Sequence, residues 1–124
     1  RYMKERTQFG RELAQFQALR FNFAKMLMDY EASKGLLMRA ASLYDAGDAQ
    51  APRFCAMAKH FVTEHCTQIV NKALQLHGGY GYLHDYHVER IYRDLRVHEI
   101  LEGSNEIMCE IIAKSVFDDE LAWC

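Results

Sequence analysis

The chain has 124 residues, half of them hydrophobic and 26% charged, with a formal net charge of −2 at pH 7. This composition excludes a disordered chain and gives no electrostatic reason to expect nucleic acid or a membrane as a partner. At this length we expect one domain over residues 1–124, with a core of its own. No apolar run reaches the ~18 residues that a membrane-spanning helix needs.

The beginning of the chain has the pattern of a helix interior. The first residue is Arg1 and not Met, and there is no signal peptide. We therefore expect a fragment of a longer protein, in which residues 1–6 are the end of a helix that starts earlier. A short loop is expected over residues 7–10.

Apolar residues at intervals of three and four predict helices over about residues 12–46, 52–77 and 86–96, and from Ser104 onward. Glycines mark the ends of the first two, at Gly47 and Gly78. Pro52 suits a first helical turn, and Asp85 is predicted to cap the third helix. The expected fold class is all-α, an antiparallel up-and-down four-helix bundle. In the first long helix the apolar stripe is Leu13, Phe16, Leu19, Phe23, Met26, Leu27, Tyr30, Leu37 and Leu43.

Cysteine and histidine spacing argues against disulfides and metal. The four cysteines (Cys55, Cys66, Cys109 and Cys124) form no C-x-x-C pair. We expect reduced thiols that pack as small apolar residues, as in a reducing compartment. The six histidines form no H-x-x-x-H helix face, so no metal site is predicted.

Residues 100–108 (Ile-Leu-Glu-Gly-Ser-Asn-Glu-Ile-Met) carry the strongest chemical signal. Glu102 stands between apolar Leu101 and the bare backbone of Gly103, where desolvation would make a carboxylate a stronger base and the glycine would leave room for a substrate. Ser104 is a candidate helix cap, and Glu106 lies in the first turn that follows. Taken alone, the segment is more typical of an ordinary loop, so its interpretation depends on the other motifs.

Three further motifs accompany it: Y-x-x-x-R-x-Q-F-G at residues 2–10, Q-x-x-G-G-x-G-Y at 75–82 and E-R-x-Y-R-D at 89–94. An arginine near a helix end can hold phosphate, and paired glycines let backbone amides approach a ligand. With E-G-S-x-E-I at 102–107, the four motifs in this order resemble the carboxy-terminal helical domain of the acyl-CoA dehydrogenases. The resemblance runs from Tyr2 to about Lys114.

The resemblance implies that FAD is the cofactor and assigns roles to individual residues. Glu102 would be the base that removes the substrate α-proton. Substrate contacts would come from Leu101, Gly103 and, more weakly, Lys114. Residues in matching positions of the family touch FAD, most of them across a subunit interface, and here these are Arg6, Phe9, Gln17, Gln75, Gly78, Gly79, Ser104 and Glu106.

The family further implies an enzyme that desaturates an acyl-CoA thioester, with a short or branched chain favoured because the motifs look most like the isobutyryl-CoA dehydrogenase branch. It implies a homotetramer (a dimer of dimers) whose subunits use part of this apolar surface as interface, and an electron-transfer flavoprotein as partner. The location would be the cytoplasm in a bacterium or the mitochondrial matrix in a eukaryote. The fragment alone is expected to be inactive. An acyl-CoA oxidase relative and a non-catalytic assembly module remain as alternatives.

Overall fold

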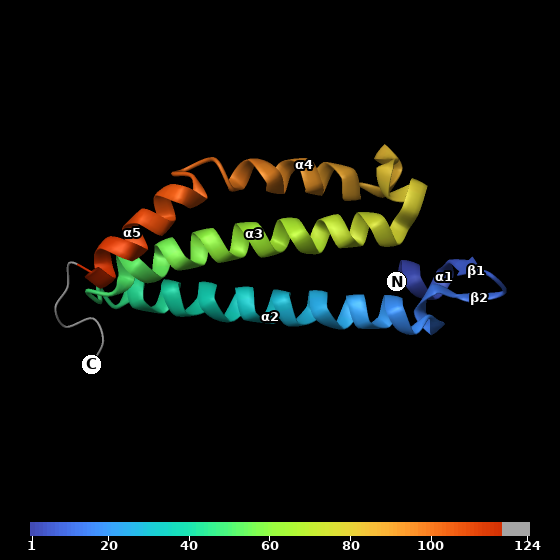
Figure 1. The fold of residues 1–124 in the computed structure, drawn as a ribbon, viewed down its shortest axis with the longest axis horizontal. Coiled ribbons are helices and arrows are strands. Elements are labelled where there is room, and N and C mark those ends of the chain that lie inside the picture. The colour runs from blue at the N-terminus through green and yellow to red at the C-terminus, as the bar shows by residue number, and fades with distance from the viewer. Residues whose placement is uncertain (118–124) are drawn as a thin grey trace.

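The computed structural model describes residues 1–117, and helices account for most of them (Figure 1). The five α-helices are α1 (Tyr2–Glu5), α2 (Gln17–Asp45), α3 (Ala51–His77), α4 (Val88–His98) and α5 (Asn105–Phe117). Two short strands, β1 (Thr7–Gln8) and β2 (Arg11–Glu12), form an antiparallel hairpin after α1. Single 3₁₀ turns are η1 (Leu13–Gln15), η2 (Gly78–Tyr82) and η3 (His84–Tyr86).

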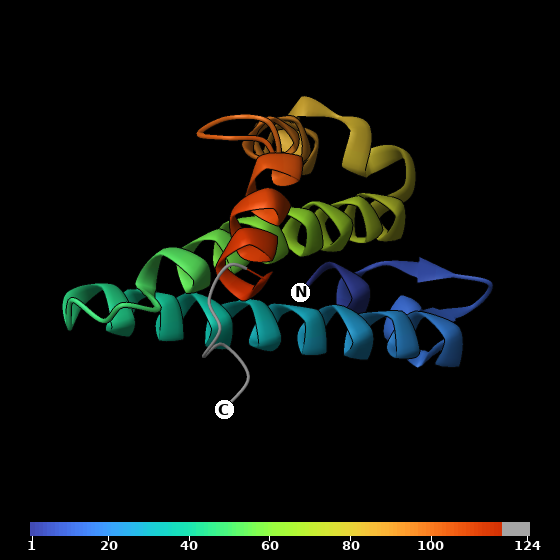
Figure 2. The same cartoon turned by 60° about the vertical axis from the view of Figure 1, so that its left-hand side comes forward.

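The central element is α3, which packs against α2, α4 and α5. α2 and α3 form a long antiparallel hairpin, and α4 runs back along the opposite side of α3 (Figure 1). α5 follows α4 after a sharp bend and crosses the amino-terminal part of α3, which is clearest in Figure 2. The expected all-α fold class is confirmed.

Small residues allow α2 and α3 to approach closely. The buried positions of α2 are Met26, Ser33 and Ala40, which recur every seven residues and so share one face of the helix. The buried residues of α3, which packs against α2, α4 and α5, are alanines and a threonine. Ser33 keeps its hydroxyl satisfied by donating to the carbonyl of Asp29 at 2.7 Å.

Part of the predicted apolar stripe is left open by residues 1–117. Phe23, Leu27, Tyr30 and Leu37 are each about half exposed (50–52%), whereas Leu19 and Leu43 are half-buried. Within residues 1–117, no large side chain is fully buried, so the core is thin. The prediction that the apolar period marks a helix is confirmed, and the expectation that part of this surface serves as a subunit interface stays a prediction.

Two helix starts differ from the sequence-based expectation. The long helix begins at Gln17 and not near residue 12, because η1 and the extended backbone of Phe16 (φ −82°, ψ 120°) precede it. α4 begins at Val88, because η3 and the left-handed His87 (φ 59°) occupy the expected first turn. Asp85 therefore lies in η3 and does not cap α4, whereas Pro52 is in the first turn of α3 as predicted.

No helix within residues 1–117 combines the length and apolarity needed to cross a membrane. Over the same residues, no group of three potential metal-ligating side chains comes together. Cys55, Cys66 and Cys109 are free thiols, and burial raises the pKa of Cys66. Cys109 is exposed, contrary to the expectation of apolar packing, and Cys124 lies outside the described residues.

Candidate functional site

The β1–β2 hairpin presents Phe9 at its tip. Gln8 pairs with Arg11, so Phe9 and Gly10 form a two-residue loop, and both have positive φ (52° and 77°), as a type I′ turn requires. A left-handed conformation costs a non-glycine residue about 1–2 kcal/mol. Phe9 nevertheless occupies it with 92% of its surface exposed. The hairpin therefore directs an aromatic ring away from the chain.

A cavity of about 590 Å³ lies beside this hairpin, at the carboxyl end of α3. Its wall includes Arg6 from the first motif and Gln75, Gly78 and Gly79 from the second. These motifs are far apart in sequence, and the fold brings them together around one cavity. The Arg6 guanidinium lies 5.1 Å from the centre of the Tyr80 ring, and no carboxylate of residues 1–117 forms an ion pair with it. Its charge is thus available to an anion.

The three glycines of η2 have different reasons to be glycine, and the first two of them line the cavity. Gly78 combines φ 58° with ψ −140°, a conformation that is essentially restricted to glycine. Gly79 has an ordinary φ, and a Cβ there would meet nothing within 4 Å. Gly81 is buried, and a Cβ there would lie 2.6 Å from the Leu74 carbonyl oxygen. Sequence reasoning missed Gly81, although the third glycine of G-G-x-G was the available signal.

An aromatic cluster holds α1 against the end of α3. The Tyr2 hydroxyl donates to the His77 carbonyl at 3.2 Å, and the two rings stack with centroids 4.2 Å apart. Tyr86 meets the edge of Tyr2 at 6.2 Å. These contacts fix Arg6, which follows α1 directly, relative to the glycines. The tyrosine of the first motif was quoted in the sequence, but its bonding partner could not be read from it.

Glu102 lies in the loop between α4 and α5 and is exposed in this chain. It adopts a left-handed conformation (φ 56°), and Gly103 continues it at φ 87°. A Cβ on Gly103 would lie 2.7 Å from the mobile end of the Met108 side chain. Leu101 is 48% exposed. The apolar walls expected around the carboxylate are therefore not provided by residues 1–117.

The start of α5 stabilises negative charge next to this loop. The pKa of Glu106 is lowered by a hydrogen bond from its own backbone N–H and by one from the Ser104 side chain, with smaller contributions from His60 and Lys59. The Ser104 carbonyl accepts the Met108 N–H at 3.0 Å, which begins the helical pattern. Ser104 thus directly precedes the helix and Glu106 lies in its first turn, as the sequence predicted.

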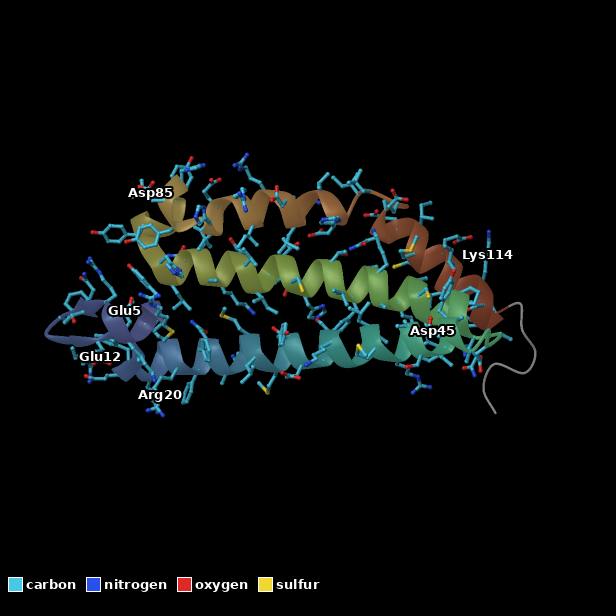
Figure 3. All side chains as sticks on the ribbon, turned by 180° about the vertical axis from the view of Figure 1, so that it is seen from behind. Glu5, Glu12, Arg20, Asp45, Asp85 and Lys114 are labelled. Carbon is cyan, nitrogen blue, oxygen red and sulfur yellow. The ribbon has the colours of Figure 1, made fainter. Side chains whose placement is uncertain are left out.

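Two predicted residues lie neither at the cavity nor in the Glu102 loop. Gln17 is the exposed first residue of α2 and does not line the cavity. Lys114 is exposed and pairs with Glu110 at 3.2 Å. Figure 3 shows Lys114 at one end of the bundle, with Glu5 and Asp85 at the other.

The predicted site residues therefore form two groups and not one. The first group surrounds the cavity at the carboxyl end of α3, before α4 begins, and the second follows the end of α4 (Figure 1). α4 has 11 residues, which corresponds to a helix about 16 Å long. One ligand molecule can contact both groups of the same chain only if it is at least that long.

Comparison with known proteins identifies the fold. The family model for the acyl-CoA dehydrogenase C-terminal domain matches residues 1–117. The chain is 47% identical to the 3-(aryl)acrylate reductase of Clostridium sporogenes over 116 residues (94% of the chain) and to the mitochondrial isobutyryl-CoA dehydrogenase of Bos taurus over 118 (95%). The butyryl-CoA dehydrogenase structure of Megasphaera elsdenii covers 94% of the chain at a TM-score of 0.90 and 34% identity, and this chain covers 30% of that one.

The chain spans 28–30% of the length of these two curated relatives. Solved relatives include one described as an FAD complex. The family match extends over both groups of predicted site residues and over all four sequence motifs. The chain therefore belongs to the acyl-CoA dehydrogenase family, and residues 1–117 correspond to the family's carboxy-terminal domain.

Proposed function

We propose that this chain is the carboxy-terminal domain of a longer FAD-dependent enzyme that introduces an α,β double bond into an acyl-CoA thioester. The observation that carries the proposal is Glu102, an exposed carboxylate held in a left-handed conformation before Gly103. Backbone strain of this kind persists where surrounding structure enforces it, and it concentrates at functional sites. A loop glutamate without a role would gain stability from an ordinary φ.

Glu102 would act as the general base. Its carboxylate takes the α-proton of the thioester, and the electron pair of that C–H bond forms the double bond as the β-hydrogen leaves. FAD, when bound, accepts that hydrogen as hydride. Gly103 has no side chain beside the carboxylate, and the end of Met108 takes the place of the missing Cβ, so glycine here lets the loop pack against α5 with Glu102 exposed. An α-proton is a weak acid, so catalysis also needs donors aimed at the thioester oxygen and a site closed to water.

The first group fits an FAD phosphate region. Arg6 offers a charge without an ion-pair partner in residues 1–117, and Gly79 offers a backbone that no side chain of its own covers. Phosphate is bound well by a guanidinium and by backbone N–H groups together. We assign Arg6, Gln75, Gly78 and Gly79 to the pyrophosphate and adenosine of a neighbouring subunit's FAD, with Phe9 packing against the adenosine. Gln17, Ser104 and Glu106 are assigned to FAD contacts by the family pattern.

Substrate and partners follow from the relatives. We favour a short or branched acyl-CoA, with Leu101 and Gly103 at the acyl chain and Lys114 toward the CoA portion. Similarity to a reductase as well as to a dehydrogenase means that the physiological direction needs measurement. We propose an electron-transfer flavoprotein (Etf) as electron partner, since one relative is the CarC subunit of the caffeyl-CoA reductase–Etf complex of Acetobacterium woodii. A homotetramer would cover the exposed α2 face, in the bacterial cytoplasm or the mitochondrial matrix.

The test compares wild-type full-length protein with Glu102→Gln across a panel of acyl-CoAs, with a dye as electron acceptor. General-base catalysis contributes about 10²–10⁴-fold, so kcat should fall by at least that much while FAD stays bound. Glu89→Gln makes the same change of charge on α4 and should keep wild-type rates.

Retention of most activity by Glu102→Gln would move the base to another part of the protein. Rapid oxygen consumption by the reduced enzyme would instead favour an acyl-CoA oxidase. Tight FAD binding without turnover of any acyl-CoA would favour a non-catalytic module.

A further inference from the structure

The loop that carries Glu102 is tied at both ends by a single side chain of another helix. Lys59, on α3, donates from Nζ to the Glu99 carbonyl at 3.3 Å and to Asn105 Oδ1 at 2.8 Å. Glu99 is the residue that caps α4, and Asn105 is the first residue of α5. The ammonium group therefore bridges the two helix ends between which the loop runs.

Two further hydrogen bonds close this arrangement. The backbone N–H of Asn105 donates to the same Glu99 carbonyl at 3.0 Å. The hydroxyl of Thr63, one turn along α3 from Lys59, lies 3.2 Å from Asn105 Oδ1 and shares its one proton between that oxygen and the Lys59 carbonyl at 2.8 Å. Asn105 is buried, with 9% of its surface exposed. Its amide oxygen thus depends mainly on Lys59 for satisfaction, and an unsatisfied buried acceptor costs about 1–3 kcal/mol.

Lys59 uses its charge for this purpose and not for an ion pair. No carboxylate of residues 1–117 pairs with its Nζ. Instead the ammonium lies at the carboxyl end of α4, where unpaired carbonyls and the helix dipole favour a cation. A lysine with two neutral acceptors, half-buried between three helices, is placed to hold backbone in position.

The held segment is the strained one. Glu102 and Gly103, both with positive φ, lie between the two tied ends. A loop with free ends would relax toward ordinary φ values and move the carboxylate. From these contacts we infer that Lys59 is a positioning residue: by joining the end of α4 to the start of α5, it fixes the loop in which Glu102 is presented to the substrate. This inference rests on the proposed function of Glu102.

The first test is kinetic and uses full-length protein with FAD bound. Lys59→Met keeps the length of the side chain and removes its donors. Since a misplacement of 1 Å can cost about 10²-fold, we expect kcat to fall about 10- to 100-fold with KM and FAD content nearly unchanged. Lys59→Arg keeps charge and donors and should recover much of the rate. Lys25→Met makes the same chemical change at an exposed α2 lysine that lies off the Phe23–Leu37 stripe and forms no ion pair within residues 1–117, and it should match wild type.

A second pair of variants tests the same tie from its other side. Asn105→Asp keeps the acceptor for Lys59 and suits the first turn of a helix, so it should retain the rate. Asn105→Leu removes the acceptor and should reproduce the kcat loss of Lys59→Met. This pair remains informative if Lys59→Met fails to fold.

Amide hydrogen exchange separates the tie from the chemistry. In Lys59→Met the amides of residues 101–105 should exchange at least tenfold faster, while those in the middle of α3 stay as protected as in wild type. Unchanged exchange, or unchanged kcat in both Lys59→Met and Asn105→Leu, would overturn the inference. Faster exchange combined with full activity of Glu102→Gln would uphold the tie and reject Glu102 as the base.

Discussion

The two ends of α4 carry site residues in different states of completion. At one end, Arg6 and the glycines of η2 already enclose a cavity within this chain. At the other, Glu102 is exposed on a loop that has a fixed backbone and no walls. The first region can be understood from its own contacts. The second supplies only a reactive group and its orientation, and the environment that would make the carboxylate a strong base has to come from other parts of the protein.

This difference follows from how each region is stabilised. Stacked rings and a hydrogen bond between Tyr2 and His77 hold the cavity, so its shape is a property of local packing. The Glu102 loop is held through its ends, and Glu102 itself is exposed between them. The proposed binding region and the proposed reacting region thus place different demands on one small domain.

The largest effect that separates the two regions should come from Arg6→Met. Loss of a charge-assisted hydrogen bond to phosphate is expected to weaken FAD binding about 10- to 100-fold. The measurement is the FAD dissociation constant of the full-length protein, with Arg90→Met at an exposed position of α4 as the matched control. FAD affinity equal to wild type would remove the cavity from the cofactor site.

Gly81→Ala and Gly79→Ala separate a contribution to the fold from a contribution to ligand binding, since only Gly79 of the two lines the cavity. A Cβ at Gly81 would collide with the Leu74 carbonyl oxygen and His77, so we expect about 1–3 kcal/mol of lost stability, seen as a lower Tm. A Cβ at Gly79 meets open space, so Tm should hold while FAD binding weakens. The reverse pattern, with Gly79→Ala unstable and Gly81→Ala normal, would contradict this division.

Gly103→Ala tests the other region. At φ 87° a side chain costs about 1–2 kcal/mol, and the new methyl would also lie 2.7 Å from the end of Met108, which displaces the loop that carries Glu102, so both Tm and kcat/KM should fall. Gly47→Ala, with φ 63° and no atom of residues 1–117 within 4 Å of the new Cβ, isolates the backbone cost and should lower Tm alone. Equal kcat/KM in the two variants would show that Gly103 serves only the turn.

The smallest expected effect concerns Glu106. Its folded-state pKa is lowered, so its contribution to stability is full at neutral pH and is lost as the pH falls through that lowered pKa. Glu106→Gln should therefore lower Tm slightly at pH 7, and the difference from wild type should vanish at low pH. A difference that persists in acid would mean that the glutamate acts through packing.

The sequence predicted the helical class and most of the elements because helix periodicity and glycine placement are local properties. It missed the start of α2, since the apolar spacing of Leu13 and Phe16 is helical although their backbone is not. It also assigned Arg6 and Gly79 to one site, but this assignment came from the family resemblance and not from a physical argument about their positions. What it could not give were contacts between distant residues, such as Lys59 with Asn105, and the exposure of the α2 stripe. Both depend on how helices meet.

The left-handed backbone of Glu102 has a consequence for protein engineering. A search for thermostable variants of this domain would favour glycine or asparagine at that position, because both accept positive φ more readily than glutamate. Such a search, if it scored only melting temperature, would discard the proposed base among its first gains. Stability and activity are thus expected to trade off at this one residue, and any stabilisation programme should hold it constant.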